Sequence, residues 1–156
     1  MQMYKKATYK VETVGECLSE MKPLLEKHWE EIALHKDKIK LDPDYDKYQE
    51  MEDAGTLQIV TARVGGQLVG YFISFVLMHP HYKEHSFAVN DILFVDMSYR
   101  RTLVGVGMFK YAEDKLKELG VSVIMVSMKT HAPFDHLCES LGYTNVERTY
   151  SKYIGE

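Results

Sequence analysis

The stretch YRRTLVGVG, residues 99–107, places two arginines directly before a predicted helix that extends to Leu119. No acidic residue follows until Glu113. A helix N-terminus exposes about four unpaired backbone N–H groups and roughly half a positive charge. Because Gly105 and Gly107 also leave the backbone uncovered, the stretch predicts a site for an anion from outside the chain. Close packing of the helix on a sheet is the alternative reason for the two glycines.

Strands and helices alternate on both sides of this stretch. Apolar residues in alternating or continuous runs predict strands over 3–11, 57–64, 67–78, 88–97, 121–128 and 145–154. Helical spacing between capping residues predicts helices over 14–32, 42–55, 104–119 and 133–142. Pro23 is expected to kink or divide the first helix, Asp42 and Pro43 to begin the second, and Gly65-Gly66 to form a hairpin turn. This order predicts an α/β (α+β) fold with a mixed central sheet of six to seven strands and about four helices on both faces.

Length and composition exclude several classes of protein. The 156 residues are 46% hydrophobic and 27% charged, which is typical of a globular protein, and we expect 1–156 to be a single domain. No apolar run approaches the ~20 residues that span a bilayer, so no membrane partner is expected. Cys17 and Cys138 lack metal-site spacing, which favours a reducing, cytoplasmic location. The net charge of −4 argues against a nucleic-acid partner and is compatible with a cationic one; a homodimer is also compatible with the sequence.

The stretch ILFVDMSYRRTLVGVGMFKYAEDKLKELG, residues 92–120, resembles the coenzyme-binding strand, loop and helix of the GNAT superfamily of acetyl-CoA-dependent N-acetyltransferases. The order of elements and the stretch LCESLGY, residues 137–143, extend this resemblance over nearly the whole chain. The family signature is Arg or Gln, two residues, Gly, one residue, then Gly or Ala. Arg100 takes its first place and Gly105 its last, while Leu103 replaces the first glycine. The stretches HPHY (79–82), VNDIL (89–93) and SKYI (151–154) are similar to acetyltransferase-like proteins of tailed phages, which implies a location in the host cytoplasm.

The resemblance implies where acetyl-CoA, the coenzyme A co-substrate, would bind. In such folds the strands equivalent to 88–97 and 121–128 splay apart, and the pantetheine arm lies between them on backbone groups of Leu93, Phe94 and Val95. His131 takes the place where many relatives carry an asparagine that contacts the coenzyme. The diphosphate would rest on Arg100, Arg101, Thr102, Leu103, Val104, Gly105, Val106 and Gly107. The resemblance implies no metal.

The resemblance also implies direct attack of an amine on the thioester, which needs a general base and a general acid. Asp91 is the predicted base because it shares strand parity with Leu93 and Val95, and because a carboxylate in an apolar strand must be paired or functional. A hydrogen-bonded structural carboxylate is the alternative. In the family a tyrosine of the last helix protonates the thiolate, and here Cys138 occupies that position. Cys138 as donor, Cys138 as a packed thiol, Tyr143 as donor and release of the thiolate to water all stay open.

Three functions are compatible with these residues. The expected function is transfer of acetyl to a primary amine of a small cationic molecule or a protein; the second predicted helix would attract such a cation through Asp42, Asp44, Asp46, Glu50, Glu52 and Asp53, unless these acids form only a solvated surface. The alternative is a catalytically silent acetyl-CoA-binding protein that acts through protein–protein contacts, a role that Leu103 and Cys138 leave open. A metal-binding loop at His79, His81 and His85 is the third.

Overall fold

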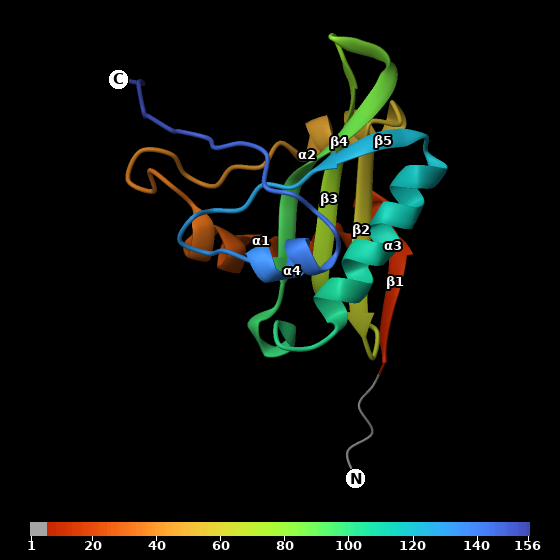
Figure 1. Cartoon of the computed structure of the whole chain (residues 1–156). Coiled ribbons are helices and arrows are strands. Elements are labelled where there is room, and N and C mark those ends of the chain that lie inside the picture. The colour runs from red at the N-terminus through yellow and green to blue at the C-terminus, as the bar shows by residue number, and fades with distance from the viewer. Residues whose placement is uncertain (1–5) are drawn as a thin grey trace.

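The computed structural model describes residues 6–156, which contain one five-stranded sheet (Figure 1). The first four strands pair as antiparallel neighbours in chain order, and the fifth is parallel to the fourth. They are β1 (Ala7–Val11), β2 (Leu57–Val64), β3 (Gln67–His79), β4 (Tyr82–Val95) and β5 (Val121–Met125). The sheet is therefore mixed, as predicted, and the parallel pair needs a helical crossover between β4 and β5.

Four α-helices cover the two faces of the sheet, as predicted (Figure 1). Helices α1 (Val14–Ile32) and α2 (Tyr45–Asp53) lie on one face, whereas α3 (Val104–Glu118) and α4 (Asp135–Ser140) lie on the other. A short 3-10 helix, η1 (Met97–Tyr99), leads from β4 towards α3. In the part of the chain that the structure describes, no helix is both long and apolar enough to cross a membrane.

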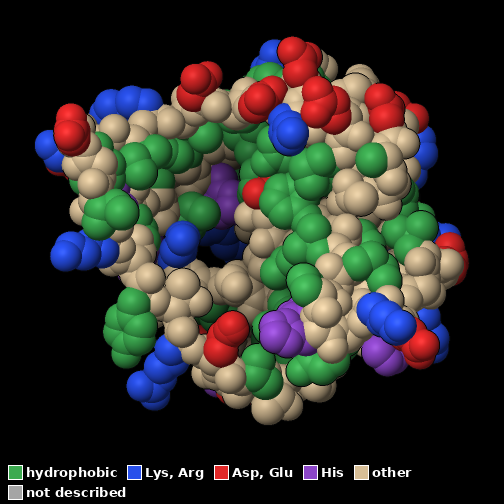
Figure 2. Space-filling view, turned by 90° about the horizontal axis from the view of Figure 1, so that it is seen from above, with side chains coloured by type: hydrophobic (Ala, Val, Ile, Leu, Met, Phe, Trp, Pro, Cys, Tyr) green, Lys and Arg blue, Asp and Glu red, His purple; other side chains and the backbone are tan. Residues whose placement is uncertain are grey.

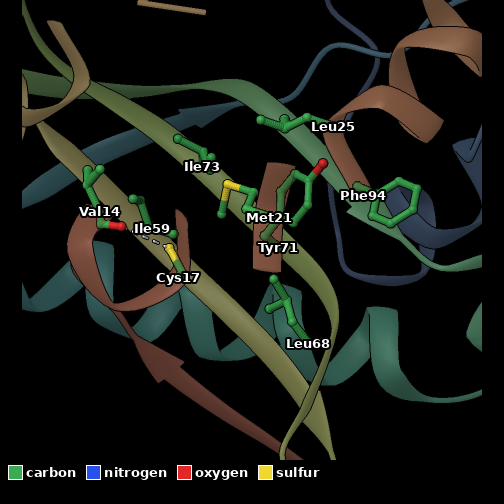
Figure 3. Close-up of a cluster of buried hydrophobic side chains, with 9 residues drawn as sticks. All are labelled: Val14, Cys17, Met21, Leu25, Ile59, Leu68, Tyr71, Ile73 and Phe94. Atoms are coloured by element: carbon green, nitrogen blue, oxygen red, sulfur yellow. Dashed lines mark hydrogen bonds between the residues drawn. The ribbon is translucent and has the colours of Figure 1, made fainter. Parts of the chain in front are cut away.

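Each face of the sheet has its own hydrophobic core, because side chains alternate along the strands. On β4, Phe94 packs towards α1, whereas Leu93 and Val95 pack towards α3. Figure 3 shows the core under α1, formed by Val14, Cys17, Met21, Leu25, Ile59, Leu68, Tyr71, Ile73 and Phe94. The buried residues of the core under α3 are Val60, Ala62, Val69, Phe72, Val104, Met108, Phe109, Ala112 and Cys138.

The predicted number of strands is wrong: residues 6–156 contain five instead of six to seven. The segment 145–154 forms no strand, and the first strand begins at Ala7, with residues 3–5 outside the described range. Val146, Tyr150 and Ile154 remain 69%, 90% and 86% exposed. These three side chains therefore do not pack on the sheet, and the segment leads away from it (Figure 1).

The structure also tests three predictions made from short stretches of sequence: a hairpin turn, a proline in a helix and the start of a helix. The Gly65-Gly66 hairpin is confirmed, with φ angles of 59° and 81° that glycine adopts readily. Pro23 lies inside α1 without dividing it, because apolar residues on both sides of the proline pack on the sheet. The predicted start of α2 at Asp42 and Pro43 is wrong: the side chain of Asp44 caps the helix by accepting a 3.0 Å hydrogen bond from the amide of Lys47.

Candidate active site

The pairing of β4 with β5 ends at Val89 and Met125, and the two segments then diverge. The side chain of Asn90 bridges the point of divergence: its Nδ2 donates to the Ser127 carbonyl at 3.0 Å, and its Oδ1 accepts from the Ser127 amide at 2.7 Å. Beyond this bridge, β4 pairs only with β3 within residues 6–156, so its other backbone edge borders the gap. Asn90 was not among the predicted site residues, although it carries the same signal as Asp91, a polar side chain in an apolar strand.

Asp91 is the extra residue of a β-bulge in β4, because Ile73 pairs with Ile92 and Ser74 pairs with Asn90. The Tyr48 hydroxyl of α2 donates to its Oδ2. Burial raises the pKa of Asp91, although the Tyr48 hydrogen bond partly opposes the effect.

The predicted strand parity of Asp91 is wrong. Leu93 and Val95 pack on the α3 face, whereas the Asp91 carboxylate contacts α2 on the opposite face, because the bulge interrupts the alternation. Tyr48 is therefore a neighbour of the predicted base, although it was not among the predicted site residues. An aromatic residue in an otherwise acidic helix was the available signal.

The N-terminus of α3 has no side-chain cap and no acidic residue in its first turn. Within residues 6–156, the amides of Leu103, Gly105 and Val106 donate to no protein acceptor, while the amide of Val104 donates to Thr102 Oγ1 at 3.3 Å. A Cβ built on Gly105 meets nothing closer than a Leu137 methyl group at 3.6 Å. This helix end is therefore open to an anion, which its unpaired amides and dipole would stabilise.

Gly107 has a different structural reason from Gly105. A Cβ at this position would overlap the phenol ring of Tyr9. The Tyr9 hydroxyl donates to the Val104 carbonyl at 3.2 Å. The phenol ring of Tyr9, a residue of β1, therefore lies directly against the first turns of α3. The packing explanation offered for the two glycines therefore holds for Gly107.

The two arginines before α3 lie in different surroundings. Arg100 donates from Nε to the Val95 carbonyl at 2.7 Å and pairs with Glu31 of α1 at 2.6 Å. Its guanidinium lies 5.6 Å from the centre of the Phe94 ring. Arg101 is exposed and forms no ion pair or side-chain hydrogen bond within the described range 6–156. Arg100 thus joins the loop to α1 and β4, and Arg101 is the guanidinium left for an external anion.

The predicted proton donors lie on the α3 face of the sheet, opposite the Asp91–Tyr48 contact. Cys138 is 8% exposed in the core under α3, and burial, followed by the nearby acidic side chains, raises the pKa of its thiol. The Tyr143 hydroxyl donates to Glu113 at 3.0 Å, and burial raises its pKa as well. Both groups are therefore protonated at neutral pH.

Three of the histidines that the sequence singled out have protein neighbours. His131 Nε2 lies 3.1 Å from the Glu31 carbonyl, and His85 Nδ1 lies 2.8 Å from Ser122 Oγ. The His79 ring lies 5.0 Å from those of Tyr82 and Phe87. Among the residues that the structure describes, no group of three or more His, Cys, Asp or Glu side chains could hold a metal ion.

A cavity of about 310 Å³ lies on the α1 and α2 face of the sheet. Its walls come from α1, the segment 39–43, α2 and strands β2, β3 and β4. Tyr48 and Ile92 both line it, so the cavity adjoins the Asp91 bulge. Seen from above, the molecule has a hollow with hydrophobic side chains along its walls and a histidine and basic side chains in its depth (Figure 2). No histidine lines the 310 Å³ cavity, so this floor lies outside the cavity.

Comparisons with known proteins show what this chain is similar to. The acetyltransferase (GNAT) family model matches residues 19–143, and no curated protein matches the chain. An aminoglycoside acetyltransferase from an uncultured soil metagenomic sample, solved with sisomicin, has a TM-score of 0.75 at 16% identity and 96% coverage of both chains. A ribosomal-protein-alanine N-acetyltransferase from Brucella melitensis has a TM-score of 0.72 at 19% identity, covering 96% of this chain and 100% of that one. A predicted acetyltransferase from Clostridium acetobutylicum, solved with acetyl-CoA, has a TM-score of 0.69 at 13% identity, covering 95% and 96%.

Proposed function

This chain belongs to the acetyltransferase (GNAT) family, and on that premise we propose that it transfers the acetyl group of acetyl-CoA to a primary amine. The open N-terminus of α3 is the observation that carries the proposal. Three amides there have no protein acceptor within residues 6–156, and the diphosphate of the coenzyme is an anion that such a helix end binds. The Leu103 side chain is 79% exposed, so this departure from the family signature leaves the backbone accessible.

The proposed coenzyme site continues from α3 into the gap between β4 and β5. The pantetheine arm would use backbone groups of Leu93, Phe94 and Val95 on the β4 edge that no other described strand pairs with. Arg101 would contact the phosphates, whereas Arg100 would hold the loop through Glu31 and the Val95 carbonyl. The neighbouring positions Thr102, Val104, Val106 and His131 stay predicted coenzyme contacts.

The proposed reaction joins an amine nitrogen to the acetyl carbonyl carbon. The new N–C bond forms as the C–S bond breaks, and coenzyme A leaves as a thiolate that then takes a proton. The ammonium group loses two protons as it becomes an amide. Asp91 would accept the first, because its raised pKa brings its basicity closer to neutral pH, and the second replaces the proton that the thiolate takes up. Cys138 and Tyr143 stay alternative proton donors to the thiolate, alongside water.

Calorimetry and a thiol-release assay together test this function. We expect acetyl-CoA and coenzyme A to bind, and we expect thiol release that depends on both acetyl-CoA and an added primary amine. Binding without thiol release on any amine would favour the catalytically silent binding protein. Absence of coenzyme binding by the folded chain would contradict both functions.

Asp91→Asn tests the base. We expect kcat to fall by about 10²–10⁴-fold while coenzyme affinity stays within twofold. In the unmodified enzyme, kcat/KM should fall as the pH drops through a midpoint above the ordinary aspartate pKa, because protonated Asp91 cannot accept a proton. The pH of this midpoint should be the same for amines of different basicity. The part of the pH profile that reflects deprotonation of the substrate should instead shift with the pKa of each amine. Asp114→Asn, an exposed carboxylate on α3, is the control; equal activity of both variants would contradict the assignment.

Narrower features stay predictions of the sequence. They are that residues 1–156 act as one domain, that the protein is similar to phage-encoded relatives and works in the cytoplasm, and that a homodimer is compatible with it. Size measurement in solution would decide the last of these.

A further inference from the structure

We propose that the acceptor is a small molecule with one primary amine on a compact apolar body, held in the cavity between α1, α2 and the sheet. This inference rests on the proposed acetyl transfer and narrows its substrate class. The cavity of about 310 Å³ is near the lower end of the volumes that hold small molecules, about 300–1,000 Å³. Its walls are mainly aliphatic and include Leu18, Met21, Leu41, Ile73 and Ile92.

A group suited to a single ammonium ion adjoins the cavity behind Tyr48. Tyr48 lines the cavity and donates to Asp91 Oδ2. Within residues 6–156, Asp91 Oδ1 accepts no protein hydrogen bond. A half-buried carboxylate with a free oxygen beside an apolar cavity is complementary to an ammonium group attached to a hydrocarbon body. Because Asp91 is also the proposed base, such a substrate would place its nitrogen at the reacting end.

Of the six acidic residues predicted to attract a cation, only Asp42 lines the cavity, where it is exposed and accompanied by the exposed Lys40. Asp46, Glu50 and Asp53 do not line the cavity. Glu52 accepts from the Val14 amide at 2.7 Å, so its carboxylate is used in joining α2 to α1. The helix contributes its tyrosines, Tyr45 and Tyr48, to the cavity instead. Because Lys40 opposes the charge of Asp42, a polycation would leave its further ammonium groups mainly against aliphatic walls, where desolvation disfavours them.

The chemistry of the cavity predicts a steep dependence on the apolar body. Each CH₂ group that enters such a cavity is expected to improve kcat/KM about fourfold until the space is full. Hexylamine and 1,5-diaminopentane make a matched pair, because they have similar lengths and differ in whether a methyl or an ammonium group ends the chain. We expect hexylamine to exceed the diamine at least tenfold in kcat/KM, and we expect a steady rise from propylamine to hexylamine.

Two variants connect this preference to the cavity. Leu41→Ser should lower kcat/KM for hexylamine several-fold, and by more than for the diamine, while coenzyme affinity stays unchanged. Leu34→Ser is the matched control, because Leu34 lies on the same α1–α2 connection at a similar exposure, 43% against 38% for Leu41, but does not line the cavity. It should change neither amine.

Binding is measured separately from turnover, as the shift in melting temperature that each amine causes in the presence of coenzyme A. Turnover of the diamine equal to or better than that of hexylamine would overturn the inference and leave acetyl transfer intact. Stabilisation by hexylamine that Leu41→Ser removes, without thiol release from any amine, would support the cavity and contradict acetyl transfer. Absence of both binding and turnover of hexylamine by the folded protein would overturn the inference.

Discussion

Glu12 shows at the residue scale how a buried charge stabilises this fold. Its carboxylate accepts from Arg63 Nε and Nη2, both at 2.9 Å, and from the Thr61 hydroxyl. Only 5% of the Glu12 side chain and 19% of the Arg63 side chain are exposed. We expect Glu12→Gln to lower the free energy of unfolding by about 2–3 kcal/mol, measured by urea denaturation at pH 7. The matched variant Glu16→Gln, which breaks an exposed pair with Lys10, should cost less than about 1 kcal/mol.

The difference in the free energy of unfolding between the unmodified protein and Glu12→Gln should depend on pH in a defined direction. The Arg63 hydrogen bond holds the pKa of Glu12 below its ordinary value. The stabilisation is therefore complete above the ordinary glutamate pKa and is lost as the pH falls through the lower pKa of the folded state. Denaturation curves of the unmodified protein and of Glu12→Gln should converge in acid. A constant difference between the two at every pH would contradict this account.

The two glycines that begin α3 predict different outcomes at the scale of the element. Gly105→Ala has room for its methyl group and should raise the free energy of unfolding by about 0.5 kcal/mol without loss of acetyl-CoA binding, because the family signature accepts alanine at this position. Gly105→Glu, which brings a carboxylate to the same helix end, should weaken acetyl-CoA binding at least tenfold, because that carboxylate competes with the phosphates. Gly107→Ala should instead cost about 2 kcal/mol, because its methyl group displaces the Tyr9 ring. Urea denaturation and calorimetry measure the two effects, and unchanged coenzyme affinity in a folded Gly105→Glu would contradict the diphosphate site.

The sequence predicted the elements whose signals are local, and missed features that depend on distant partners. The bare start of α3 and the Gly65-Gly66 hairpin follow from their own residues. The failure of 145–154 to form a strand depends on whether a neighbouring edge accepts it, and the bulge at Asp91 depends on the register with β3. Every second side chain of a strand points to the same face, but this rule holds only where the pairing with the neighbouring strand is regular. The contact between Tyr48 and Asp91, 43 residues apart, therefore lay beyond local pattern.

At the scale of the whole molecule, the features of the proposed site lie on different faces of the sheet. The α3 face carries the open helix end and the buried Cys138, whereas the α1 face carries the cavity and the Asp91–Tyr48 contact. β4 borders both and diverges from β5 beyond Asn90. A coenzyme on one side and an acceptor on the other would therefore meet at β4. The paired arginines of the sequence likewise divide into one that holds the loop to α1 and one that faces outward.

The different surroundings of Arg100 and Arg101 predict how each arginine affects the melting temperature with and without the coenzyme. Ligand at 100 times its Kd adds about 2.7 kcal/mol to the folded state, so acetyl-CoA should raise the melting temperature by about 5–10 °C for a chain of this size. Arg101→Ala should weaken binding about tenfold, which lowers the added stability at the same concentration to about 1.4 kcal/mol and halves the shift. Arg148→Ala, an exposed arginine outside the proposed site, should leave the shift unchanged. Arg100→Ala should lower the melting temperature of the free protein, because it removes the contacts with Glu31 and the Val95 carbonyl. Equal shifts in Arg101→Ala and Arg148→Ala would place the phosphates away from α3.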